Sequence, residues 1–152
     1  MLLGCFAGVL LVGAPYLPTL TPQVQAALKL ADLKPGQTLL ELGCGDGKVV
    51  LAAAKQGIIA VGYELNPLLA LVAWLRTRRY RKLVTIKCQN FWQGSWPPAD
   101  AIFVFLLPKY MSKLDKKVMQ EYKYNVKVMS FAFKIPNKIF AKELDGVFLY
   151  MY

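Results

Sequence analysis

Three glycines after one short apolar segment constrain the fold of this chain more than any other feature. Gly43, Gly45 and Gly47 stand at every second position, directly after residues 38–42 (TLLEL) and before residues 48–56 (KVVLAAAKQ). Glycine permits positive φ angles and a close approach of the backbone to a ligand. A helix that begins there offers unpaired N–H groups to an acceptor. The pattern therefore predicts a strand, a ligand-binding loop and a helix.

Strands and helices are expected to alternate along most of the chain. We expect strands at 38–42, 58–65, 84–89, 101–107, 126–134, 138–144 and 147–152. We expect helices at 23–31, 48–56, 67–81 and 112–123, the first with Thr21 as N-cap and Pro22 at its first position. The segment 90–100 is a loop, and Asp145-Gly146 predicts a terminal hairpin. This order is typical of an α/β protein with a mostly parallel sheet that ends in an antiparallel β-hairpin.

Two carboxylates stand at the ends of the first two predicted strands. Glu64 follows Gly47 by seventeen residues, and a carboxylate there is placed to accept the hydroxyls of a ribose. The dinucleotide pattern G-x-G-x-x-G is absent, and Gly47-Lys48 is followed by Val49, which excludes a Walker A loop. Glu41 would repel a pyrophosphate but suits a cation, which favours S-adenosylmethionine. The alternative is a glycine turn that binds nothing.

The first fourteen residues (MLLGCFAGVLLVGA) are all apolar or small. As a helix they would span about 21 Å, short of the ~30 Å hydrocarbon core of a bilayer. They are the end of a longer membrane helix, an interfacial anchor, or a buried core helix. We favour a membrane-associated segment over residues 1–14, followed by a domain over 15–152, because a core helix would show a polar stripe.

Charge and composition narrow the chemistry further. Residues 1–75 are neutral overall, whereas residues 76–152 carry fifteen basic and five acidic side chains, which favours an acidic partner. The chain has no histidine, which excludes Ser-His and Cys-His nucleophiles and most zinc sites, so no metal site is predicted. Three scattered cysteines indicate a reducing compartment.

Five motifs together resemble a known enzyme family: PYLPT, ELGCGDGKVVLAAAKQG, AVGYELNPLL, NFW and FVFLLPKYM. The glycine loop followed by YELNP is similar to class I, seven-β-strand S-adenosylmethionine-dependent methyltransferases. The full set is similar to the membrane-anchored mitochondrial protein-lysine methyltransferases that modify the adenine nucleotide translocase and the ATP synthase c-subunit, and to their prokaryotic relatives. The resemblance implies a Rossmann-like, mostly parallel seven-stranded sheet with helices on both faces.

The resemblance also implies which residues bind the cofactor S-adenosylmethionine, whose product after methyl transfer is S-adenosylhomocysteine. These cofactor-binding residues are Pro18, Thr19, Glu41, Gly43, Cys44, Gly45, Asp46, Gly47, Glu64, Leu65, Asn66, Asn90, Phe91 and Phe105. Asn90 would hydrogen-bond the edge of the adenine, where the family commonly has an acid. Lys48 would flank the amino-acid end of the cofactor.

The expected catalytic and acceptor-site residues are Tyr16, Thr19, Pro108, Tyr110 and Met111. Tyr110 and Met111 have simple helix packing as an alternative, and no side chain stands out as a general base. The resemblance implies an N-methyltransferase that modifies lysine in a membrane-embedded protein, and we expect it to be a monomer. It would lie on an anionic membrane surface, the prokaryotic cytoplasmic membrane or a mitochondrial membrane. The alternatives are a methyltransferase of nucleic acid or a small molecule, and a non-catalytic basic binding module.

Overall fold

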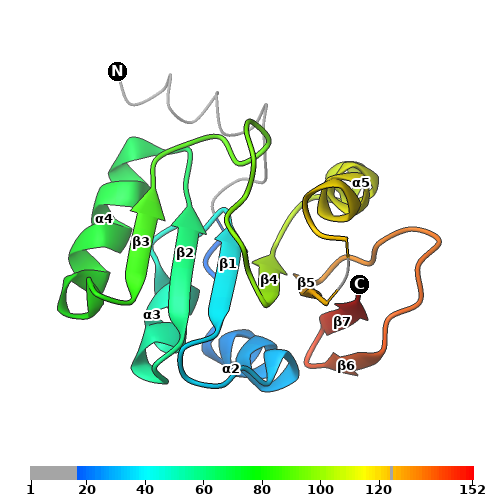
Figure 1. Cartoon of the computed structure of the whole chain (residues 1–152), viewed down its shortest axis with the longest axis horizontal. Helices are drawn as coiled ribbons and strands as arrows, with labels where there is room; N and C mark the ends of the chain where they lie inside the picture. The colour runs from blue at the N-terminus through cyan, green and yellow to red at the C-terminus, as the bar shows by residue number, and fades with distance from the viewer. Residues whose placement is uncertain (1–16, 124) are drawn as a thin grey trace.

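A computed structural model describes residues 17–123 and 125–152 of the protein. Within them, seven strands form one sheet in the order β3-β2-β1-β4-β5-β7-β6 (Figure 1). Their bounds are β1 Thr38–Leu42, β2 Ile59–Tyr63, β3 Val84–Lys87, β4 Ala101–Val104, β5 Lys127–Phe131, β6 Lys142–Leu144 and β7 Val147–Met151. Strands β1 to β5 pair in parallel, and β7 runs antiparallel between β5 and β6. The predicted mostly parallel sheet is confirmed.

Helices cover both faces of this sheet. They are α2 Thr21–Ala31, α3 Lys48–Lys55, α4 Pro67–Thr77 and α5 Met111–Glu121, with short 3₁₀ turns at Arg78–Tyr80 and Pro108–Tyr110. Alternate residues of a strand point to opposite faces, so the core has two parts. Leu39 and Phe103 pack with α2 and α3, whereas Leu40 and Ile102 pack with α5.

Several predicted boundaries were wrong. Thr21 lies inside α2, and Leu20 occupies the N-cap position without a side-chain cap. The segment 101–107 leaves the sheet after Val104 and leads to a 3₁₀ turn that begins at Pro108. Only the last three residues of 138–144 form a strand, and the chain turns earlier, at Asn137, whose φ is 57°.

The C-terminal hairpin was predicted correctly. Leu144 pairs with Val147 across Asp145 and Gly146, whose φ angles are 49° and 77°. Positive φ at both central residues is typical of a type I′ turn, which matches the twist of the flanking strands.

Residues 1–14 lie outside the described part of the chain, so their predicted membrane association stays a prediction. Among residues 17–123 and 125–152, no helix combines the length and the apolar character that crossing a membrane requires.

Candidate functional site

A cavity opens at the carboxyl ends of β1 and β4, where the strand order of the sheet reverses. Ligands of open α/β sheets bind at this switch point. The cavity measures about 860 Å³, open solvent at its mouth included. It is lined by Leu17, Pro18, Thr19, Glu41, Leu42, Gly43, Cys44, Gly45, Asp46, Lys48, Val49, Glu64, Leu65, Leu69, Asn90, Phe91, Phe103, Phe105 and Leu106.

The glycine loop, residues 43–47, is held in place by the backbone of β2. The N–H groups of Gly43 and Cys44 both donate to the carbonyl oxygen of Tyr63, at 2.9 and 2.8 Å. A Cβ on Gly62 would lie 2.7 Å from the Cys44 sulfur, so only glycine allows this approach. Gly43 has a φ of +86° and open space where a Cβ would stand. Its backbone is therefore accessible to a ligand.

Glu64 joins the glycine loop to the start of α4. One carboxylate oxygen accepts from the Gly45 N–H and the other from the Asn66 N–H, both at 2.8 Å. The side chain is buried yet lines the cavity. Each carboxylate oxygen has a second acceptor site, so Glu64 can accept ligand hydroxyls while it holds the loop.

Glu41 is a buried carboxylate that lacks a full set of partners. It is 4% exposed, and its Oε2 has no hydrogen-bond partner among the described residues. Burial raises the pKa of Glu41 well above its ordinary value of 4.5. The Val50 backbone opposes this rise, and the charges of Asp46 and Glu64 add to it. A cation beside Glu41 would supply the missing partner and favour the ionised carboxylate.

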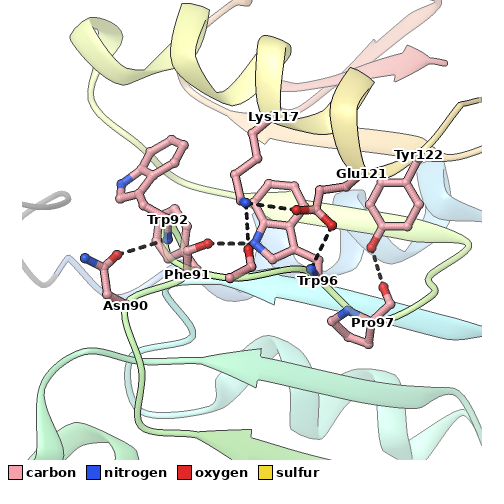
Figure 2. Close-up of polar contacts among 9 residues, drawn as sticks. Asn90, Phe91, Trp92, Trp96, Pro97, Lys117, Glu121 and Tyr122 are labelled. Atoms are coloured by element: carbon pink, nitrogen blue, oxygen red, sulfur yellow. Dashed lines mark hydrogen bonds and ion pairs between the residues drawn. The ribbon is translucent and has the colours of Figure 1, made fainter.

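The loop after β3 brings Asn90 and Phe91 to the cavity (Figure 2). The side-chain oxygen of Asn90 accepts from the Trp92 N–H at 3.0 Å, which leaves its NH₂ group as a donor. The Trp96 indole N–H donates to the Phe91 carbonyl at 2.7 Å. These bonds fix the backbone on both sides of Phe91.

Helix α5 fastens the same loop from the outside, as Figure 2 shows. Glu121 accepts from the Trp96 N–H and from the Lys117 ammonium, both at 2.9 Å. Lys117 also donates to the Gly94 carbonyl, and the Tyr122 hydroxyl donates to the Pro97 carbonyl. The loop is thus positioned by side chains that lie about 25 residues further along the chain.

Phe105 lines the cavity beyond β4 as an apolar wall, and two further aromatic rings pack against it without lining the cavity themselves. Phe105 packs against Phe131, with ring centroids 4.6 Å apart, and against Phe133 at 6.3 Å. Phe131 ends β5, the strand next to β4. This wall is apolar, in contrast to the carboxylates beneath the glycine loop.

Most of the predicted cofactor-binding residues line the cavity, and two do not. Asn66 caps α4, because its side chain accepts from the Leu68 and Leu69 N–H groups. Gly47 meets α4, because a Cβ there would lie 2.9 Å from the Cβ of Ala73. Both residues therefore position the loop and helix α4 around the cavity without lining its surface.

The predicted catalytic residues are dispersed. Thr19 lines the cavity and is buried, whereas Tyr16 lies outside the described residues. Pro108 and Tyr110 do not line the cavity, and Tyr110 packs against Trp92 with ring centroids 6.1 Å apart. Met111, the first residue of α5, is 0% exposed in the core, which fits the packing alternative rather than an acceptor contact.

Sequence reasoning missed the apolar part of the lining: Leu17, Leu42, Val49, Leu69, Phe103 and Leu106. A signal existed for Phe103, because it precedes Phe105 by two residues and alternation within the predicted strand 101–107 would put both on one face. Leu69 had no comparable signal, because its position depends on how α4 packs.

The strand order, the glycine loop after β1 and the acid that follows β2 define a class I methyltransferase fold. Residues 41–141 match the family model described as the ANTKMT methyltransferase domain. The chain therefore belongs to the ANTKMT methyltransferase domain family.

Named relatives agree with this assignment. The chain is 35% identical over 144 residues to the ATP synthase c-subunit lysine N-methyltransferase of Xenopus laevis, covering 90% of this chain and 62% of that protein. It is 30% identical to a protein-lysine N-methyltransferase of Saccharolobus islandicus, covering 80% of this chain and 78% of that protein. The chain thus spans about three fifths of the length of the Xenopus protein.

A solved structure also matches. The RNA methyltransferase of Salinibacter ruber in complex with S-adenosyl-L-homocysteine superimposes with a TM-score of 0.80 at 27% identity. The match covers 88% of this chain and 91% of that chain.

Proposed function

We propose that this protein is an S-adenosylmethionine-dependent N-methyltransferase that modifies lysine side chains of a membrane-associated protein. The observation that carries the proposal is Glu41, a buried carboxylate with an unpartnered oxygen in a cavity beside a glycine loop. S-adenosylmethionine supplies a methyl group on a positively charged sulfonium and carries a positive amino group. A dicarboxylate cavity fits such a cation and disfavours a pyrophosphate.

The residues around the cavity would divide the binding between them. Glu41 would face the cationic end, and Glu64 would accept the ribose hydroxyls with the acceptor sites left by Gly45 and Asn66. Asn90 would donate its NH₂ group to the adenine edge, since its oxygen accepts from Trp92. Phe91 would line the face of the base.

The aromatic wall around Phe105 would prepare the acceptor. A lysine ammonium must lose a proton before it can attack a methyl group. Apolar surroundings disfavour the charged form and lower the pKa of an amine. The Phe105 ring, held by Phe131 and Phe133 behind it, would exclude water from the incoming lysine. The buried side chain of Thr19 lines the same cavity.

The proposed setting is a membrane that faces a reducing compartment. Cys44 and Cys88 are both free thiols, and fifteen basic side chains in residues 76–152 suit an anionic surface. The protein-lysine N-methyltransferases among its relatives support a protein substrate. We further propose that the enzyme acts as a monomer.

A transfer assay tests the proposal and its strongest alternative together. Membrane, soluble-protein and RNA fractions are each incubated with tritiated S-adenosylmethionine and the full chain. We expect label in membrane protein, recovered as methyl-lysine, and we expect Glu64→Ala to abolish it. The similarity to an RNA methyltransferase favours RNA as the second candidate substrate. Label confined to RNase-sensitive material would overturn the lysine proposal.

A further inference from the structure

Helix α4 has an unusual distribution of side-chain size. Its large apolar side chains are exposed: Leu68 56%, Leu71 51%, Val72 36%, Trp74 57% and Leu75 44%. Its buried positions are the small residues Ala70, Ala73 and Thr77. A helix on a soluble domain normally turns its large apolar residues inward. We call the five exposed side chains the α4 face.

The inward side of α4 must be small, because it packs against the glycine loop. Ala73 stands where a Cβ on Gly47 would come within 2.9 Å. This close contact explains the alanines, but it does not explain five large apolar residues on the outside. Their positions 68, 71, 72 and 75 follow a helical i, i+3, i+4, i+7 pattern and make one continuous stripe. No other labelled element lies on the outer side of α4 (Figure 1).

A cluster of cations continues the stripe where the α4 face ends. Arg78, Arg79, Arg81 and Lys82 are all exposed, and none has an ion pair among the described residues. Arg76 differs, because it pairs with Asp46 at 2.6 Å. Residues 66–82 contain no acidic side chain. The apolar stripe is therefore followed by at least four uncompensated positive charges.

We propose that the α4 face and the adjoining cations form an interfacial binding surface for an anionic lipid bilayer. Eleven helical residues span about 16 Å, too little to cross a membrane but enough to lie in its surface. Exposed tryptophan and basic residues are typical of such helices. A second copy of the chain is a poorer partner, because two chains that each carry a net charge of +10 repel one another.

The surface is coupled to the candidate site, and this part rests on the proposed function. Helix α4 begins beside Asn66, whose N–H bonds to Glu64, and Leu69 of the same helix lines the cavity. A bilayer against the α4 face would therefore lie next to the cavity. This placement would give access to lysines close to the membrane surface, and the α4 face would restrict the substrates to that zone.

The test uses tryptophan fluorescence of the full chain with vesicles, because it reports the position of Trp74 even if residues 1–14 also bind lipid. Vesicles contain phosphatidylcholine with about one third phosphatidylserine and a brominated lipid that quenches nearby tryptophans. We expect strong quenching in the wild type and loss of most of it in Trp74→Phe. Trp96 is buried, and Trp92 is half-buried in the loop after β3. Quenching that persists unchanged in Trp74→Phe would overturn the proposal.

Two variant pairs test the composition of the surface. The double variant Leu71→Ser, Leu75→Ser is expected to need about tenfold more lipid for half-maximal quenching. Ile139→Ser is the control, because it changes an apolar side chain that is 92% exposed away from α4, and it should leave this lipid concentration unchanged. The double variant Arg78→Gln, Arg79→Gln should weaken quenching on anionic vesicles but not on neutral ones. The control Lys116→Gln, Lys142→Gln removes two positive charges elsewhere and should leave quenching unchanged. Equal effects of test and control variants would contradict the proposal.

Other occupants of the α4 face give distinct results. A dimer in analytical ultracentrifugation that dissociates in the Leu71→Ser, Leu75→Ser variant would assign the face to a second copy. If Trp74 is quenched only after residues 1–14 are deleted, that segment occupies the α4 face in the full chain. Both outcomes overturn the lipid proposal. Calorimetry with S-adenosylmethionine on the same variants separates this question from the enzyme proposal, because a failure to bind there would overturn the enzyme proposal alone.

Discussion

Two loops line the same cavity, and they are held in place in different ways. The glycine loop, residues 43–47, takes its shape from glycines and from bonds to the backbone of β2 and to Glu64. The loop of residues 90–100 takes its shape from side chains of α5, chiefly Glu121, Lys117 and Tyr122 (Figure 2). The conformation of the first loop depends mainly on its own glycines, whereas that of the second depends on side chains distant in sequence.

This difference predicts how substitutions disturb each loop. A change in the glycine loop should act through backbone strain and close packing at the altered residue. A change at α5 should act at a distance, by releasing the loop that presents Asn90 and Phe91. The variants below are ordered by the expected change in the free energy of unfolding.

The largest effect is expected at Gly47. Gly47→Ala places a methyl 2.9 Å from Ala73 at a φ of +84°, so it should destabilise the protein by about 2–4 kcal/mol. Gly43→Ala is the matched control, because its φ is +86° but nothing lies within 4 Å of the added Cβ. It should cost only about 1–2 kcal/mol. Urea denaturation measures both, and equal losses would show that packing against α4 is unimportant.

An intermediate effect is expected at Glu121. Glu121→Ala leaves the Trp96 N–H without its acceptor and breaks the ion pair with Lys117, which should cost about 1–3 kcal/mol. It should also weaken S-adenosylmethionine binding, although Glu121 does not line the cavity. Glu143→Ala is the control, since it also removes an acceptor of a backbone N–H, but at an exposed hairpin. Unchanged affinity in Glu121→Ala would show that the loop keeps its position without α5.

The smallest effect is expected at Tyr122. Tyr122→Phe removes the hydroxyl that donates to the Pro97 carbonyl at 2.5 Å and should cost about 1 kcal/mol. Thermal denaturation compares it with Tyr80→Phe, where the described residues show no hydroxyl bond. A larger loss at Tyr80 would contradict this ranking of the contacts around residues 90–100.

The two loops also explain how much could be predicted from sequence. Strand β1 was predicted with its exact bounds, because Gly43 ends a short apolar segment. The lining by Glu41, Gly45 and Glu64 followed from the same local pattern. The network of Lys117, Glu121 and Tyr122 left no signal, because it depends on how α5 packs beside a distant loop.

Two expected site residues lie away from the cavity surface for the same reason. Asn66 was assigned to the cofactor, but its side chain satisfies the first N–H groups of α4, a role that motif spacing alone does not distinguish. Met111 was assigned to the acceptor site, but the packing of α5 buries it completely. The large apolar residues of α4 are compatible with a helix whether they face the core or the solvent, and only the structure shows that they face outward.

Calorimetric titration with S-adenosylmethionine across about pH 5 to 8 tests most directly whether Glu41 meets a cation. Burial holds the pKa of Glu41 above its ordinary value, so a cation that needs the ionised form must displace a proton at low pH. Wild-type affinity should therefore rise with pH and level off once Glu41 is ionised. Glu41→Gln should bind at least about tenfold more weakly at neutral pH and lose this pH dependence, with Glu143→Gln as a control like the wild type. Equal affinity and an equal pH profile in Glu41→Gln would contradict the proposed cation site.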